Sequence, residues 1–178
     1  KQYTKELLEA LDAFVGGNPE GDVTLVEFFD YRCGACKRFA PLLTRLTMQD
    51  PNLRIVYKEF PILGPDSVHA AQAALAAQDQ GHYLKFHAAL MSAAVPLTNE
   101  AVIVAARSVG LDVDQLERDM ETPKVLNVLD NNRRLGEAMH INSTPTLIVG
   151  DNIIRGPMPI RKLMKMITRV RSKDSWPN

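Results

Sequence analysis

Apolar residues along the chain follow two different spacings, one typical of strands and one typical of helices. Short continuous runs rich in β-branched and aromatic residues occupy positions 23–30 (VTLVEFFD) and 53–60 (LRIVYKEF), as in buried strands. Between them, apolar residues recur every three or four positions over 36–48, which predicts a helix. A strand, a helix and a strand in this order favour a parallel crossover.

The centre of the chain is rich in alanine and predicts helices alone. Breaks at Gly81, Pro96 and Gly110 separate its helical patterns. The expected helices cover residues 69–80, 81–93, 99–110, 113–120 and 125–140. We interpret residues 63–140 as an all-helical subdomain inserted into a mixed core.

After the insertion, a hairpin and a helix complete the core. Residues 146–149 and 152–155 are short apolar runs on either side of a Gly-Asp pair, which is a hairpin signal, and residues 160–170 have helical spacing. The expected fold class is therefore α/β, with a core made of residues 19–62 and 141–178.

The N-terminal segment, residues 1–18, precedes this core. Apolar residues at helical spacing over 4–15 (TKELLEALDAFV), followed by Gly-Gly-Asn-Pro, predict an amphipathic helix. Its apolar stripe packs either on its own domain or on a second copy of the chain, so the helix is a candidate oligomerisation segment. Because the numbering starts at Lys1 and not at Met, we expect that a leader or another N-terminal segment has been removed.

Composition narrows the class of protein. The 178 residues suit a single domain, and no apolar run approaches the roughly 20 residues that cross a bilayer, so we expect a water-soluble chain. The 21 basic residues equal the 21 acidic ones, which gives no support for nucleic acid as a partner.

Both cysteines lie in the stretch FFDYRCGACKRFAP, at positions 33 and 36. A disulfide across a two-residue loop restricts the unfolded chain very little, and a zinc site needs about four ligands where this chain offers two thiols and scattered histidines. We therefore interpret the pair as a redox couple and expect neither a metal nor a cofactor.

The expected local structure gives the two sulfurs different properties. Cys33 falls where a strand passes into a helix, and the backbone N–H groups of a helix N-terminus favour a thiolate. Arg32 and Lys37 are further positive charges nearby. Cys36 lies one turn deeper and suits a resolving thiol.

These features together resemble a known family. A strand, CGAC and a helix, followed far downstream by STPT (143–146) before another strand, resemble the thioredoxin superfamily. The helical insertion is similar to that of the DsbA-like branch, and the strings VEFFDYRCGAC and INSTPTLIVG look like its ScsC/Com1-type members. The resemblance extends over residues 20–172 and implies a thioredoxin fold with an inserted helical subdomain.

The resemblance also implies roles for individual positions. Cys33 corresponds to the nucleophilic cysteine and Cys36 to the resolving one. Pro145 corresponds to a cis-proline that holds the backbone of Thr144 open beside the sulfurs for a substrate strand. Proline suits this place because a cis bond costs least before proline.

Four more residues belong to the expected site. Gly34 and Ala35, between the cysteines, are expected to contact substrate. They replace the Pro-His of DsbA, which implies a less oxidising couple. Glu27 corresponds to a buried acid that relays protons to the resolving cysteine, and Lys58, in the next strand, corresponds to its partner.

The function implied by the resemblance is that of a bacterial periplasmic thiol–disulfide oxidoreductase, DsbA-like, acting on protein substrates. A membrane partner would reoxidise or reduce it. An isomerase or reductase uses the same atoms and would act as an oligomer through residues 4–15. In another class, the alternative is a peptide-binding or Cu(I)-binding chaperone on the same fold, since two close thiolates suit Cu(I).

Overall fold

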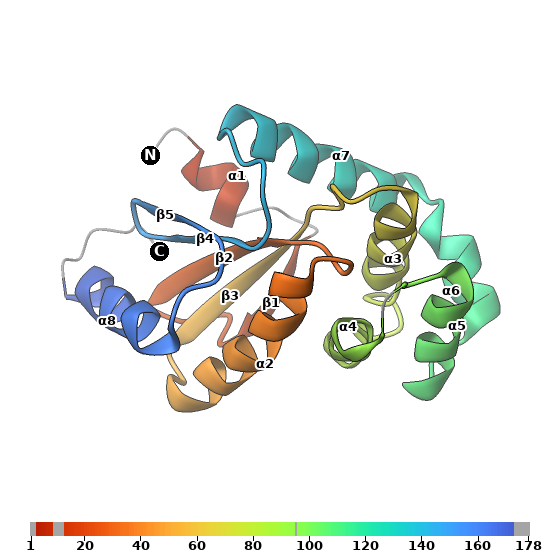
Figure 1. Ribbon diagram of the computed structural model, residues 1–178, viewed down its shortest axis with the longest axis horizontal. Helices are drawn as coiled ribbons and strands as arrows, with labels where there is room; N and C mark the ends of the chain where they lie inside the picture. The colour runs from red at the N-terminus through yellow and green to blue at the C-terminus, as the bar shows by residue number, and fades with distance from the viewer. Residues whose placement is uncertain (1–2, 9–12, 95, 173–178) are drawn as a thin grey trace.

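One five-stranded sheet organises the chain, which a computed structural model describes over residues 3–8, 13–94 and 96–172 (Figure 1). The strands lie in the order β1-β3-β2-β4-β5. β2 and β3 run parallel, and the other neighbouring strands run antiparallel. The predicted parallel crossover and the predicted hairpin are both confirmed. The strand bounds are β1 Phe14–Gly17, β2 Val23–Phe29, β3 Leu53–Glu59, β4 Thr146–Val149 and β5 Asn152–Arg155.

Helices cover both faces of this sheet (Figure 1). α2 (Gly34–Gln49) and α8 (Ile160–Arg171) pack on the face that carries the odd-numbered residues of β2, while α1 (Thr4–Leu8) and α7 (Pro123–Ala138) pack on the face with the even-numbered ones. All seven residues of the central strand β2 are buried, which explains why its sequence is largely apolar.

The predicted helical insertion is confirmed as α3 (Pro65–Ala76), α4 (Tyr83–Ser92), α5 (Asn99–Ser108), α6 (Val113–Met120) and α7. α3 lies at its centre and contacts each of the other four helices. Most buried residues of α3 are alanines, so these helices can approach it closely. One continuous hydrophobic cluster extends from the sheet into the insertion, so the two parts share a core.

The N-terminal segment differs from the single helix predicted over residues 4–15. α1 ends at Leu8, residues 9–12 lie outside the described residues, and β1 begins at Phe14. β1 pairs with the edge of β3, which gives both backbones hydrogen-bond partners. Gly17 permits the close approach, because its φ is +69° and a Cβ there would lie 2.4 Å from the carbonyl oxygen of Leu53. The prediction of a helix up to residue 15 is therefore wrong.

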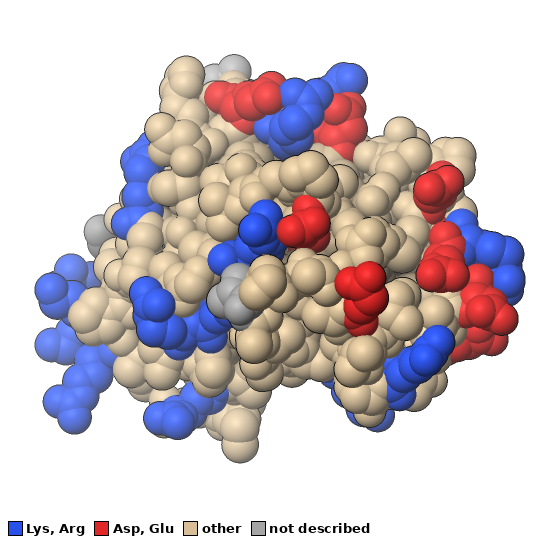
Figure 2. Space-filling model, turned by 45° about the vertical axis from the view of Figure 1, so that its right-hand side comes forward, with Lys and Arg blue, Asp and Glu red and all other residues tan. Residues whose placement is uncertain are grey.

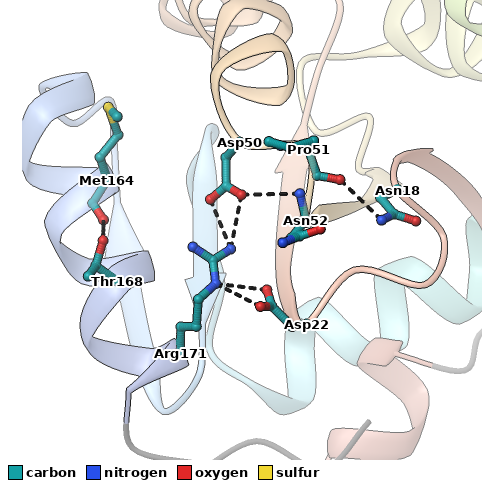
Figure 3. Close-up of polar contacts among 8 residues, drawn as sticks. All are labelled: Asn18, Asp22, Asp50, Pro51, Asn52, Met164, Thr168 and Arg171. Atoms are coloured by element: carbon teal, nitrogen blue, oxygen red, sulfur yellow. Dashed lines mark hydrogen bonds and ion pairs between the residues drawn. The ribbon is translucent and has the colours of Figure 1, made fainter.

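Arg171 fixes the end of α8 to the rest of the core (Figure 3). Its Nε donates to both carboxylate oxygens of Asp22 at 2.8 and 2.9 Å, and its Nη2 donates to both oxygens of Asp50 at 3.0 and 2.9 Å. Asp50 is the C-cap of α2, and Asp22 immediately precedes β2. One guanidinium thus joins three elements that the sequence separates widely.

Candidate functional site

Cys33 is the N-cap of α2, directly after the loop that follows β2. The backbone N–H of Cys36 donates to Sγ of Cys33 at 3.4 Å, and the Cys33 thiol donates to the carbonyl oxygen of Thr144 at 3.2 Å. Cys33 is half-buried, whereas Cys36 is fully buried, and both are free thiols. Cys33 is therefore the sulfur that a substrate can reach.

Pairing of β4 with β2 brings the second part of the site to the cysteines. Thr146, the first residue of β4, lies opposite Phe28 near the end of β2. The preceding Thr144–Pro145 peptide bond is cis, as predicted. The predicted closeness of this loop to Cys33 is also confirmed by the hydrogen bond to Thr144, 111 residues away along the chain.

Asp30 holds the loop between β2 and α2 in place. Its Oδ1 accepts from the backbone N–H of Arg32 at 2.7 Å and from the hydroxyl of Ser67 at 2.8 Å, and its Oδ2 accepts from the backbone N–H groups of Ile62 and Leu63 at 2.9 and 3.0 Å. Four donors satisfy a carboxylate that is only 1% exposed. Sequence reasoning missed this residue, although an acid at the end of a buried strand was a usable signal.

The two cations expected near Cys33 bind elsewhere. Arg32 donates from Nη1 to the carbonyl oxygen of Leu63 at 2.8 Å. Lys37 donates from Nζ to the carbonyl oxygens of Leu90 and Ala93 at the end of α4, at 2.7 and 3.0 Å. Their hydrogen bonds therefore order neighbouring loops and helices and do not contact the sulfur.

Glu27 is a buried acid on the same sheet face as Cys36. It is 1% exposed, and neither carboxylate oxygen has a hydrogen-bond partner among the described residues. Burial raises the pKa of Glu27 to about 8. Burial also raises the pKa of the Cys36 thiol, and the charge of Glu27 adds a smaller contribution in the same direction. The charge state of Glu27 therefore influences the protonation of Cys36.

Lys58 lies on the opposite face of the sheet, so its predicted partnership with Glu27 is wrong. In the parallel register, Glu27 lies opposite Tyr57, whereas Lys58 lies opposite Phe28. Successive side chains of a strand point to opposite faces, which separates the two charges. The Lys58 Nζ donates instead to the carbonyl oxygen of Glu6 in α1 at 3.0 Å, and burial lowers its pKa to about 8.

A second buried acid, Glu59, connects the end of β3 to the helical insertion. Its Oε1 accepts from the hydroxyl of Tyr31 at 2.9 Å and from the hydroxyl of Tyr83 at 2.7 Å. The Tyr31 oxygen also lies 3.0 Å from Nδ1 of His87. Burial raises the pKa of Glu59 well above its usual range. This cluster was not predicted, because its members are scattered over three segments of the sequence.

The part of the chain that the structure describes contains neither a metal-binding cluster nor a membrane-spanning helix. No three His, Cys, Asp or Glu side chains gather there in a way that could hold a metal ion. Over the same residues, no helix is both long enough and apolar enough to cross a membrane.

Comparisons with known proteins fit this geometry. Residues 24–168 match the family model of the DSBA-like thioredoxin domain. The chain therefore belongs to this family, a branch of the thioredoxin superfamily, and the resemblance seen in its sequence is confirmed.

Solved structures of three bacterial proteins are similar to this chain. A thioredoxin-like oxidoreductase from Silicibacter pomeroyi DSS-3 is 43% identical, with a TM-score of 0.92 over 94% of this chain and 97% of that one. Proteus mirabilis ScsC is 29% identical, with a TM-score of 0.89 over 97% of this chain and 78% of the ScsC chain. The thiol-disulfide exchange protein alpha-DsbA2 from Wolbachia pipientis is 28% identical, with a TM-score of 0.89 over 95% and 92%.

Curated relatives are much longer proteins. The Na(+)/H(+) antiporter NhaA 1 of Mycobacterium sp. (strain KMS) is 28% identical over 158 residues, which is 86% of this chain and 26% of that protein. The antiporter NhaA 3 of Salinispora tropica is 26% identical over 151 residues, or 84% of this chain and 23% of that protein. The chain thus spans about a quarter of the length of these relatives.

Proposed function

We propose that the chain is a thiol–disulfide oxidoreductase in which Cys33 exchanges disulfides with protein substrates and Cys36 is the resolving thiol. The observation that carries this proposal is the position of the Cys33 sulfur. It is half-buried at the N-terminus of α2, within hydrogen-bond distance of Thr144 beside a cis-proline. Thr144, which is half-buried, together with Gly34 and Ala35, forms the surface on which a substrate segment would lie.

The proposed reaction begins with the Cys33–Cys36 disulfide. A substrate thiolate attacks Sγ of Cys33 and forms a mixed disulfide, while the bond between the two cysteines breaks and its electron pair goes to the sulfur of Cys36. Glu27 is protonated at neutral pH, because its pKa is raised to about 8, and supplies the proton to Cys36. A second substrate thiolate then attacks the substrate sulfur and releases Cys33. The substrate loses two electrons and the cysteine pair gains them.

The oxidase direction is the one we propose, in the bacterial periplasm and with reoxidation by a membrane partner. The similarity to ScsC and alpha-DsbA2 supports a DsbA-like role. An oligomeric isomerase is less well supported, because Leu7 of α1 is 3% exposed and packs in a core cluster of its own domain.

Variants of the two cysteines test the proposal. Cys33→Ser should lower turnover of a dithiol peptide at least 100-fold, because the other cysteine of the chain, Cys36, is fully buried. Cys36→Ser, mixed with the disulfide form of the same peptide, should accumulate a mixed disulfide, because Cys33 still attacks the peptide disulfide and the resolving thiol is missing. Turnover is followed by mass spectrometry of the peptide, with the exposed substitution Glu117→Gln as the control. Cys33→Ser with more than a tenth of the original rate would contradict the assigned roles.

Equilibration of the wild-type pair with glutathione buffers determines the direction. A potential near that of DsbA, about −120 mV, supports the oxidase, whereas one near that of thioredoxin, about −270 mV, supports a reductase or isomerase. Absence of exchange together with tight Cu(I) binding would instead support the chaperone alternative.

A further inference from the structure

A second concave site lies between α2 and α4. The cavity has a volume of about 540 Å³, which is within the range of small-molecule sites. Its walls are mostly apolar and include Pro41 of α2 with Leu84 and Met91 of α4. Tyr57, His87 and Met91 are its buried lining residues, and neither cysteine lines it.

The hydrogen bonds around Glu59 determine which nitrogen of His87 carries the proton. The hydroxyl of Tyr31 has one proton and donates it to Oε1 of Glu59, so its oxygen accepts from Nδ1 of His87. Burial lowers the pKa of His87 to about 3, so the ring is neutral at pH 7. A neutral ring with its proton on Nδ1 carries a lone pair on Nε2.

His87 lines the cavity and is 6% exposed. The described residues offer its Nε2 no hydrogen-bond partner. An acceptor inside a mostly apolar cavity fits a hydroxyl donor of a ligand.

Lys37 places a positive charge in the same cavity. Two of its three N–H donors bind the carbonyl oxygens of Leu90 and Ala93, which leaves one donor available. Lys37 does not take part in any ion pair of the described residues. A carboxylate is the group that complements this cation.

The separation of the two groups limits the size of the ligand. Leu90 and Ala93 follow His87 by three and six residues. At 1.5 Å per residue, this is roughly 5 to 9 Å along the helix direction. A single ring with substituents at opposite ends matches that separation.

We propose that this cavity binds a small aromatic carboxylic acid that carries a hydroxyl group. The carboxylate binds Nζ of Lys37, the hydroxyl donates to Nε2 of His87, and the ring packs between Pro41 and the apolar side of α4. This binding site is independent of the cysteine pair and of the exchange reaction proposed for it.

Three probes and the full chain with reduced cysteines provide the first test. 4-Hydroxyphenylacetate offers both groups, phenylacetate lacks the hydroxyl, and tyramine replaces the carboxylate by an amine. In isothermal titration calorimetry we expect phenylacetate to bind at least threefold more weakly than 4-hydroxyphenylacetate. Tyramine should bind at least tenfold more weakly, because it brings a second cation to Lys37.

Variants locate the binding. Ala88 is exposed on α4 and lines the cavity, so Ala88→Leu should weaken 4-hydroxyphenylacetate binding at least tenfold without disturbing the core. Ala138→Leu, an equal change at an exposed position of α7, should leave it unchanged. His87→Phe should bind 4-hydroxyphenylacetate and phenylacetate equally, and this comparison within one variant is insensitive to a loss of stability.

Three results would overturn the proposal. The first is no saturable binding of 4-hydroxyphenylacetate up to roughly 10 mM. The second is equal affinity of the wild-type chain for the probes with and without the hydroxyl. The third is unchanged binding by Ala88→Leu, which would place the ligand elsewhere. None of these results would affect the cysteine assignments, which depend on the exchange assay.

Discussion

Three buried acids in this protein differ because their neighbours differ. Asp30 accepts four hydrogen bonds, Oε1 of Glu59 accepts two, and Glu27 has no hydrogen-bond partner among the described residues. A buried carboxylate without hydrogen-bond donors is unfavourable, and binding a proton removes the charge that makes it so. Glu27 is therefore suited to proton exchange, whereas Asp30 is suited to holding a loop.

Replacing Glu27 by glutamine should change how stability depends on pH. The folded-state pKa of Glu27 is raised from 4.5 to about 8. The contribution of Glu27 to the free energy of unfolding of the wild type is therefore greatest below pH 4.5 and falls as the pH rises toward 8. The amide of Glu27→Gln does not titrate. Between these pH values, the free energy of unfolding of the variant should therefore rise relative to that of the wild type by up to roughly 1.4 kcal/mol per pH unit. The difference should level off above pH 8.

Urea unfolding at several pH values measures this difference directly. Subtracting the wild type from the variant removes the contributions of His87 and Lys58, whose lowered pKa values act in both proteins. Glu117→Gln, at an exposed position, is the matched control. A difference between Glu27→Gln and wild type that does not vary with pH would show that Glu27 is not protonated in the folded chain.

At the scale of elements, side chains from distant segments decide how helices attach to the sheet. The apolar side of α8 packs on the sheet. Its last arginine, Arg171, forms ion pairs with two carboxylates from other parts of the chain (Figure 3). Asp30 does the equivalent for the loop after β3, since it binds two backbone N–H groups there. The site is thus held by a few polar contacts at the ends of elements.

Arg171→Ala should lower the free energy of unfolding by about 1 kcal/mol, because the ion pairs of a partly exposed arginine stabilise a fold only modestly. The loss should be smaller at high salt, where exposed charges are screened. Chemical denaturation at low and high salt measures it, with Arg169→Ala on the exposed side of α8 as the control. Equal effects of the two substitutions would indicate that the pairs with Asp22 and Asp50 contribute nothing specific.

For the whole molecule, equal numbers of positive and negative residues conceal an uneven distribution. Residues 152–172 contain arginines and lysines and no acidic residue. Figure 2 shows basic side chains gathered at the left end of the molecule and acidic ones toward its top, centre and right. The electrostatic potential therefore differs in sign between regions of the surface, although the formal net charge is zero.

The sheet core and the helical insertion should unfold together. A single hydrophobic cluster contains residues of both, and the buried Glu59 cluster joins the end of β3 to α4. Exposing either part alone would open the shared core. Near-ultraviolet and far-ultraviolet circular dichroism should therefore report one coincident thermal transition. Two separated transitions would show that residues 63–140 are an independent folding unit.

Sequence patterns predicted the local structure well where one segment supplied all the information. The spacing of apolar residues defined the strands around residues 23–30 and 53–60 and the hairpin after residue 145. The same patterns failed for residues 14–17, because pairing with β3 outweighed a local helical pattern. Pairing register also decided which residue lies opposite Glu27, and this depends on two strands at once.

The sequence by itself determined the fold class and the cysteine pair, because apolar periodicity and a short motif are properties of neighbouring residues. Only the tertiary structure decided that Glu27 and Lys58 lie on opposite faces. It alone also showed that Asp30 holds two loops and that His87 and Lys37 line one cavity. These arrangements require segments that are far apart in the chain to meet, and hydrogen bonds and burial form only once they have met.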